Sequence, residues 1–253
     1  MTTIPGRRRP RFYERKTVVE LLAIVPPVLT AAVAAAINLG DPSRRTFGWL
    51  LVAGIVWLAV ASVVKVLHAH AQDREQKRRD DYDGLRGALH VLYGLVATRA
   101  AIGPKDHGRL RATIHRVVQP AAKGGAAEEL EQVLPYLGGA GSGPGRRFSI
   151  RSGVIGKAVR AKGAVTASRA SEDYEQFLVE LVRDWAYTEH DARRLSPDRR
   201  AWMAVPVFDP QGAVVAAVVY LDSNDTDFFT PELRQVILEA SSGIATYVHE
   251  VYG

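Results

Sequence analysis

The chain contains no cysteine, and this absence removes a whole set of chemistries. Disulfides, thiolate metal sites, cysteine nucleophiles and thiol-linked chromophores are all excluded. A chain without disulfides suits a reducing compartment, so we expect its soluble part to fold in the cytosol. The sequence also lacks a His-Glu-x-x-His helix, a Gly-x-Ser-x-Gly elbow and a complete dinucleotide or phosphate loop. These absences predict a protein that is not an enzyme, with no cofactor and no metal site identified.

Positive charge outweighs negative charge, and it is unevenly placed. The formal net charge is +6, and many arginines and lysines stand beside two long apolar runs in the first part of the chain. Basic residues at the ends of apolar runs are typical of membrane flanks. We therefore predict that the partner of this charge is a lipid bilayer, with no role for nucleic acid.

Two uncharged apolar runs are each long enough to cross a bilayer as a helix. They cover residues 21–39 and 47–64, and a helix of roughly 20 such residues spans the hydrocarbon core. The short segment between them contains Gly-Asp-Pro-Ser, which favours a tight turn. Residues 21–64 are thus predicted to form an antiparallel transmembrane hairpin. Pro26 and Pro27 should kink its first helix, either as a tolerated irregularity or as a hinge.

The distribution of basic residues predicts how this hairpin is oriented. Arginines and lysines are frequent in a basic tail, residues 1–20, and in a charged juxtamembrane connector, residues 65–84, whereas Arg44 and Arg45 alone lie between the spans. Cytoplasmic flanks carry the excess of Lys and Arg. We expect a two-pass protein of the cell membrane with both termini in the cytoplasm.

An apolar stripe follows the connector at helical spacing. Tyr82, Leu85, Leu89, Leu92 and Val96 recur in steps of three and four, as in a heptad pattern. Two glycines in the same stretch each weaken a helix by about 1 kcal/mol relative to alanine, so the stripe needs a partner surface. Two roles remain open for the stripe: packing in the core of its own domain, or forming a dimer interface. A similar stripe in the last helix favours the interface.

The remaining sequence alternates strand and helix signals. β-Branched residues, turn residues and helix caps mark the boundaries. The run at 213–221 is so continuously apolar that both faces of this strand should be buried. We expect strands at 109–118, near 164–167, at 201–208 and at 213–221, and helices near 152–159, within 172–190 and from 231 to the end.

Four segments, in this order, resemble the GAF family. They are Gly153-Val-Ile-Gly-Lys-Ala-Val, Met203-Ala-Val-Pro-Val-Phe, Gly212-Ala-Val-Val-Ala-Ala-Val-Val-Tyr-Leu-Asp-Ser and Asp227-Phe-Phe-Thr-Pro-Glu-Leu. The resemblance covers residues 85–253. It implies an α+β domain with a central antiparallel sheet flanked by helices and a small-molecule pocket on one face. It also implies a homodimer formed through the helices near 85–99 and 230–252.

The resemblance does not extend to two known ligand types. GAF domains similar to those of cyclic-nucleotide phosphodiesterases carry an Asn-Lys pair, then a Phe, then an Asp-Glu pair. The matching positions here are Ser223-Asn224, Phe229 and Leu233-Arg234, so only the Phe agrees. Covalent bilin attachment through cysteine, as in many phytochromes, is excluded by composition.

If the pocket follows the GAF family, its lid is the segment 168–200 and its floor is the sheet that carries Trp202 and Met203, and aromatic residues there are the main predicted ligand contacts. Aromatic rings offer a stacking surface with a polar handle, which suits a planar or heterocyclic ligand, although each of them also fits a role as core filler. The same segment holds Arg193, Arg194, Arg199 and Arg200, which either meet an anionic ligand or form a solvated loop. The predicted lining residues are Ser168, Tyr174, Phe177, Trp185, Tyr187 and Trp202.

Three functions fit this organisation. The first is a membrane-anchored sensor that binds a small molecule in the cytoplasm and signals through dimer helices to the hairpin or to a separate signalling partner. The second is an effector that disrupts the bilayer when a nucleotide-like messenger binds. The third is a constitutive membrane tether whose soluble domain mediates protein contacts.

Overall fold

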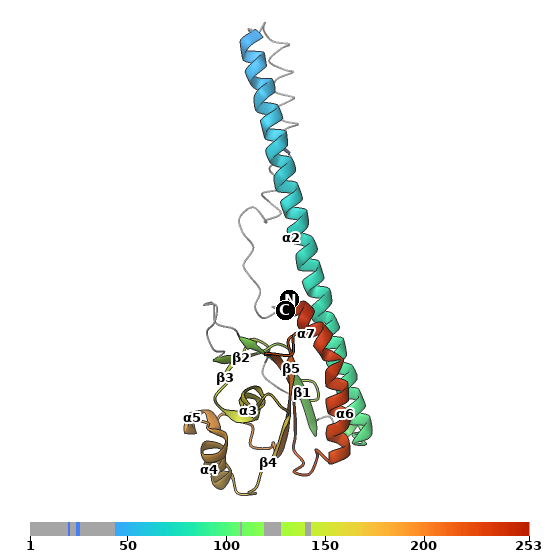
Figure 1. The fold of residues 1–253 in the computed structure, drawn as a ribbon, viewed down its shortest axis with the longest axis vertical. Helices are drawn as coiled ribbons and strands as arrows, with labels where there is room; N and C mark the ends of the chain where they lie inside the picture. The colour runs from blue at the N-terminus through green and yellow to red at the C-terminus, as the bar shows by residue number, and fades with distance from the viewer. Residues whose placement is uncertain are drawn as a thin grey trace. The chain divides into compact units, whose positions relative to one another are not determined.

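The structure is a computed structural model, and it describes residues 20, 24, 25, 44–106, 108–118, 128–139 and 143–252 (Figure 1). The chain divides into two compact units, one formed by Asp80–Gly253 and one within Arg7–Arg79. The domain boundaries predicted at residues 20, 64 and 84 stay predictions.

Helix α2 (Arg44–Arg99) is continuous from the second predicted membrane span to the end of the apolar stripe. No proline interrupts this stretch, so no backbone hydrogen bond of the helix is lost. The charged connector is therefore helical. The large apolar side chains exposed on the first part of α2 are Trp49, Val52, Ile55, Val56, Leu58, Val60, Val63, Val66 and Leu67.

Among the described residues, one helix, Val52–Arg99, is long and apolar enough to cross a membrane. No part of the apolar stretch of this helix is buried. The core helix of a soluble protein or a signal sequence can have the same length and composition, so these two properties alone are weak evidence for a membrane span. The first predicted span, residues 21–39, lies outside the described residues except at positions 24 and 25, and so do Pro26 and Pro27. The two-pass hairpin and its orientation therefore stay predictions.

Six antiparallel strands form one sheet in the order β3-β2-β1-β6-β5-β4. At its centre β1 pairs with β6, a strand about a hundred residues later, with Ile114 opposite Val219. The predicted strands are confirmed, and β6 is almost entirely buried as expected for a strand covered on both faces. The strands are β1 (Leu110–Val118), β2 (Glu129–Gln132), β3 (Arg147–Ser149), β4 (Val165–Ser168), β5 (Ala201–Phe208) and β6 (Val215–Ser223).

The turn between β5 and β6 has the chemistry that its sequence predicts. The Asp209 carboxylate accepts hydrogen bonds from the backbone N–H groups of Ala213 (2.7 Å) and Val214 (3.0 Å). Gly212 has a φ of +70°, a left-handed conformation that favours glycine. The turn joins β5 to β6, and a register shift between Val207 and Phe208 leads to the pairing in which Trp202 faces Asp222.

Short helices pack on both faces of the sheet. Two of them begin after a capping side chain. The Asp173 side chain accepts a hydrogen bond from the backbone N–H of Gln176 at the start of α4, and the Thr230 side chain accepts one from the backbone N–H of Leu233 at the start of α6. The single last helix that we predicted is in fact two helices, which divide at Gly243. The helical elements are η2 (Pro104–Asp106), α3 (Gly153–Ala161), α4 (Tyr174–Trp185), α5 (Glu189–Ala192), α6 (Pro231–Ser242) and α7 (Ile244–Tyr252).

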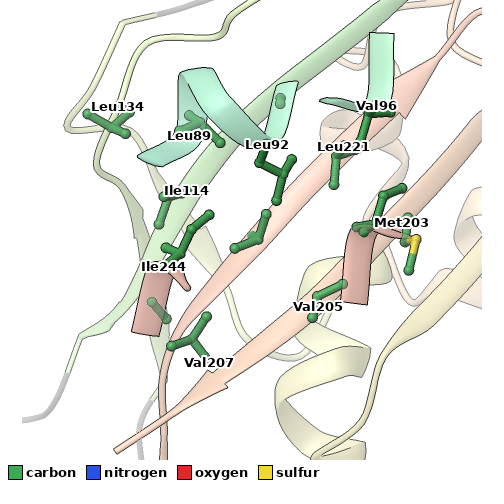
Figure 2. Close-up of a cluster of buried hydrophobic side chains, with 14 of the residues drawn as sticks. Leu89, Leu92, Val96, Ile114, Leu134, Met203, Val205, Val207, Leu221 and Ile244 are labelled. Atoms are coloured by element: carbon green, nitrogen blue, oxygen red, sulfur yellow. The ribbon is translucent and has the colours of Figure 1, made fainter. Parts of the chain in front are cut away.

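One face of the sheet is covered by the last part of α2 together with α6 and α7, and α3, α4 and α5 lie on the other side (Figure 1). Figure 2 shows Leu89, Leu92 and Val96 of α2 grouped with side chains from β1, β5 and β6. The apolar stripe is thus part of the chain's own core. Our preference for a dimer interface along this stripe is wrong, because Leu85, Leu89 and Val96 are fully buried within one chain.

Gly84 lies where α2 approaches the ring of Tyr247. A Cβ atom at position 84 would stand 2.6 Å from Cε1 of that ring, whereas at Gly87 nothing lies within 4 Å. Gly87→Ala should therefore stabilise the fold by about 0.8–1 kcal/mol through helix propensity. Gly84→Ala should destabilise it by about 1–3 kcal/mol, because the ring must move. Thermal unfolding of the two variants measures the difference, and equal shifts would contradict the close approach.

Candidate functional site

A cavity of about 640 Å³ lies on the sheet face opposite α2, α6 and α7, within the C-terminal unit. Its volume is in the range of sites for small molecules. Its lining comes from the sheet, from α3 and α4, and from the segment around α5. The lining residues are Arg111, His115, Leu130, Tyr136, Arg146, Arg147, Phe148, Ser149, Ser152, Val154, Ile155, Leu181, Trp185, Tyr187, Asp191, Arg194, Leu195, Ser196, Arg199, Trp202, Tyr220 and Asp222.

Strand alternation explains how the two central strands supply the floor of the cavity. On β1, Ala112 and Ile114 belong to the core under α2, whereas Arg111 and His115 line the cavity. On β6, Leu221 belongs to that core, and the residues on either side of it line the cavity. At these positions the two strands present polar side chains to the cavity face, whereas Arg116 and Ser223 stand on the other face in the alternation.

His115 is fully buried in the cavity floor, and neither of its ring nitrogens has a hydrogen-bond partner. Its ring meets the rings of Phe148 and Tyr220 edge-on, with centroids at 5.3 and 5.8 Å. Burial, and secondarily the charge of Arg146, lowers the pKa of His115 to about 3. The imidazole is therefore neutral at pH 7, with one donor and one acceptor nitrogen available.

A buried ion-pair network lines the same cavity as His115. Arg111 donates two hydrogen bonds to the Asp222 carboxylate, at 2.8 and 2.9 Å. Arg199 lies 3.6 Å from the same carboxylate and donates to the carbonyl of Gly108 at 2.8 Å and to Asp198 at 2.6 Å. Burial raises the pKa of Asp222, and the hydrogen bonds from Arg111 oppose this effect.

Three tyrosines of the lining keep their phenol protons. Burial raises the pKa of Tyr187 to about 12 and raises the pKa values of Tyr136 and Tyr220 as well. The guanidinium of Arg111 stands over the ring of Tyr136 at 4.7 Å. The cavity therefore offers hydroxyl donors and aromatic surface together.

The structure brings three of the six predicted contact residues to the cavity: Trp185, Tyr187 and Trp202. Trp185 is at the end of α4, where Lys157 lies 5.0 Å from its ring centroid. Whether these residues bind a ligand stays a prediction.

The other three predicted residues lie outside the lining. Phe177 is buried in a small cluster on α4 and stacks on Trp202, with ring centroids 5.7 Å apart. Tyr174 packs against the same cluster. Ser168 is exposed at the end of β4 and donates to the carbonyl of Thr226 at 3.0 Å.

The four arginines singled out by the sequence separate into two pairs. Arg194 and Arg199 line the cavity. Arg193 and Arg200 instead form exposed ion pairs with nearby glutamates, at 2.9 and 2.5 Å. The solvated-loop interpretation therefore describes only the second pair.

Sequence reasoning missed the residues of the cavity floor, above all Arg111, His115, Tyr220 and Asp222. The available signal was partial alternation: Arg111, Thr113 and His115 stand at every second position of β1, with apolar residues between them. Among the described residues, no group of three or more His, Asp or Glu side chains is placed to hold a metal ion.

His115 should make the stability of the fold depend on pH. Because its pKa is about 3 in the folded state and about 6.5 when unfolded, the unfolded chain binds more protons between these values. The contribution of the neutral His115 to the free energy of unfolding is complete above pH 6.5 and is lost as the pH falls. The free energy of unfolding should therefore decrease by about 2 kcal/mol between pH 7 and pH 5. Chemical unfolding at several pH values should show this decrease in the free energy of unfolding, and His115→Phe should remove the part that is due to His115.

The exposed His190 provides the matched control. His190→Gln should leave the slope between pH 7 and pH 5 as in the wild type. A slope that persists in His115→Phe would show that His115 is not the residue responsible.

No family model matches the sequence, and no curated protein matches it. Several solved structures are similar. The type II free methionine-R-sulfoxide reductase from Thermoplasma acidophilum is 13% identical, with a TM-score of 0.46, covering 70% of this chain and 96% of its own. The GAF domain region of a protein from Geobacter sulfurreducens is 14% identical, with a TM-score of 0.46, covering 69% of this chain and 96% of its own. At these values the similarity assigns neither a family nor an activity to this chain.

One prediction from the missing motifs needs correction. We expected a protein that is not an enzyme, yet the similar structures include free methionine-R-sulfoxide reductases, among them one from Neisseria meningitidis that is 19% identical, with a TM-score of 0.37, covering 66% of this chain and 84% of its own. Absent motifs therefore do not decide against catalysis. The six-stranded antiparallel sheet with helices on both faces is the α+β arrangement that the resemblance to GAF domains implied.

Proposed function

We propose that the protein is a membrane-anchored sensor whose C-terminal unit, a GAF-like domain, binds a small molecule in the cavity over β1, β5 and β6. The observation that carries this proposal is the unpartnered His115 at the floor of a cavity with aromatic walls. A buried polar group without a partner costs about 1–3 kcal/mol, so a binding site is a physical reason to keep it.

The anchor is the apolar first part of α2, in a cell-membrane hairpin with both termini in the cytoplasm. Its exposed side chains include Ile55 (59% exposed) and Val63 (60% exposed), which water solvates poorly. The run is of bilayer length and ends in a charged stretch that begins at Lys65.

Helix α2 is the element that would carry a signal. One uninterrupted helix holds both the exposed apolar segment and the stripe that packs in the core beneath the sheet. A ligand that favours one of two packings of this stripe would shift the helix, provided that its affinity for the two states differs. The output then passes through the hairpin or through a separate partner.

A homodimer through the helices near 85–99 and 230–252 remains part of the proposal. Because the inner stripe of α2 is used in the core, a second copy would meet the outer surfaces of these helices. The large apolar side chains exposed there are Val91, Leu95 and Leu238.

A thermal-shift screen of metabolites with the full-length protein in detergent tests the binding function. A ligand present at a hundredfold over its Kd should stabilise the fold by about 2.7 kcal/mol. Trp185→Ala should reduce that shift, because Trp185 lines the cavity. Val179→Ala is the matched control on the same helix, since Val179 is 61% exposed and lies outside the lining. A broad screen without any shift would overturn the sensor and favour the tether.

Dye leakage from liposomes separates the sensor from the membrane effector. A sensor should bind its ligand without releasing dye. Release that depends on the ligand would instead establish the hairpin as the effector.

A further inference from the structure

Two buried side chains of the cavity lining hold polar nitrogen atoms without a partner. His115 has two such atoms, and the Nε of Arg199 is the third. Both residues are at least nine-tenths buried, at 0% and 7% exposure. Desolvated donors and acceptors are normally satisfied within the fold or by a bound molecule. These atoms therefore mark a place where a polar ligand group completes the hydrogen bonding.

Arg194 adds a cationic group at the same cavity. Its side chain makes no hydrogen bond or ion pair with any described residue, whereas its neighbour Arg193 pairs with Glu189. Other arginines of the lining are already engaged: Arg111 by Asp222 and Arg147 by Glu129. Arg194 is exposed, and it brings to the cavity a positive charge that no described carboxylate pairs with.

The charge and the chemistry of these groups select one class of ligand. Five arginines and two aspartates line the cavity, so a cationic ligand is disfavoured. Guanidinium groups bind carboxylate and phosphate with good geometry. A purely apolar ligand would leave the nitrogen atoms of His115 and Arg199 without partners.

On the basis of the proposed sensor function, we propose that the ligand is a small acid with a planar ring, a carboxylate or a phosphate, whose anionic group is bound by Arg194 and whose other polar groups reach the Nε of Arg199 and His115. The ring packs against the face of Trp202 that Phe177 does not cover. Burial keeps His115 neutral, so it donates with one nitrogen and accepts with the other.

Calorimetric titration of the full-length protein in detergent tests this class with two matched pairs of probes. 2-Naphthoate is compared with 2-naphthamide, and adenosine 5′-monophosphate with adenosine. The acid of at least one pair should bind about tenfold or more tightly than its neutral partner. The pair that responds identifies carboxylate or phosphate as the preferred anion.

Variants of two adjacent arginines locate the anion. Arg194→Gln should remove most of the preference for the acid, and Arg194→Lys should retain part of it because the charge is kept. Arg193→Gln is the matched control and should change nothing, since Arg193 lies outside the lining. His115→Phe should weaken the binding of adenosine 5′-monophosphate and of adenosine alike, because it removes the contact to the polar edge of the adenine ring, whereas the naphthyl pair has no such edge and should be affected less.

Two results would overturn the inference while leaving the proposed function intact. One is equal affinity for acids and neutral partners, and the other is equal loss in Arg194→Gln and Arg193→Gln. Absence of binding by all four probes would overturn it too, and the thermal-shift screen then decides the sensor function separately.

Discussion

Leu89→Ala should lower the free energy of unfolding by about 3–5 kcal/mol. Leu89 is fully buried where α2 packs on the sheet, so truncation removes buried apolar surface and leaves a void. Urea unfolding of the full-length protein in detergent, followed by tryptophan fluorescence, measures the change. A loss of this size would be a large fraction of the stability of an ordinary domain, which is about 5–15 kcal/mol.

The control for this variant stands two residues further along the helix. Val91 is 72% exposed, and Val91→Ala should change stability by no more than about 0.5 kcal/mol. If Leu89→Ala left unfolding unchanged and instead weakened self-association, the stripe would be a dimer interface and our account of the core would be wrong.

Asp222→Asn should cost about 3–5 kcal/mol of stability. The Asp222 side chain is 2% exposed and faces two guanidinium groups, those of Arg111 and Arg199. Removing its charge leaves both cations near the cavity floor without their shared counter-ion. The loss comes from buried positive charge that has lost its main compensating carboxylate, although Arg199 keeps its contact with Asp198, and a buried pair that is intact contributes little by itself.

Asp225→Asn is the matched control, because Asp225 follows the same strand and also pairs with an arginine. Its side chain is 38% exposed, and its partner Arg109 lies at 2.5 Å and is 40% exposed. Solvent-exposed pairs contribute about 0–1 kcal/mol, so this variant should unfold close to the wild type. Equal losses in the two variants would show that the network around Asp222 is not buried as described. The same unfolding measurement serves both.

The long strands and the capped helices were predictable because local patterns determine them. β5 matches its predicted range, and β1 and β6 differ from theirs by a few residues at most. β2 and β3 were missed because they are short and rich in charge, with the sequences Glu-Leu-Glu-Gln and Arg-Phe-Ser. Their strand conformation depends on pairing with β1 and with each other.

The candidate site shows the same division. Trp185 and Trp202 were found because the resemblance to GAF domains implied where a pocket would lie and because aromatic side chains suit a ligand there. His115 and Asp222 were not, because in the sequence they are single polar residues within apolar strands. Only the pairing of β1 with β6, which sets Asp222 opposite Arg111 and His115 opposite Val218, places both residues on the face with the cavity.

By itself, the sequence determined the apolar segment of bilayer length, the absence of thiol chemistry, the main strands and the periodicity of α2. It determined these because each depends on residue type and spacing within one segment. The tertiary structure decided which surface the stripe of α2 contacts, where the last helix divides and which polar side chains share a cavity. These depend on contacts between segments far apart in the chain, and a periodic pattern shows that a face is buried without showing what buries it.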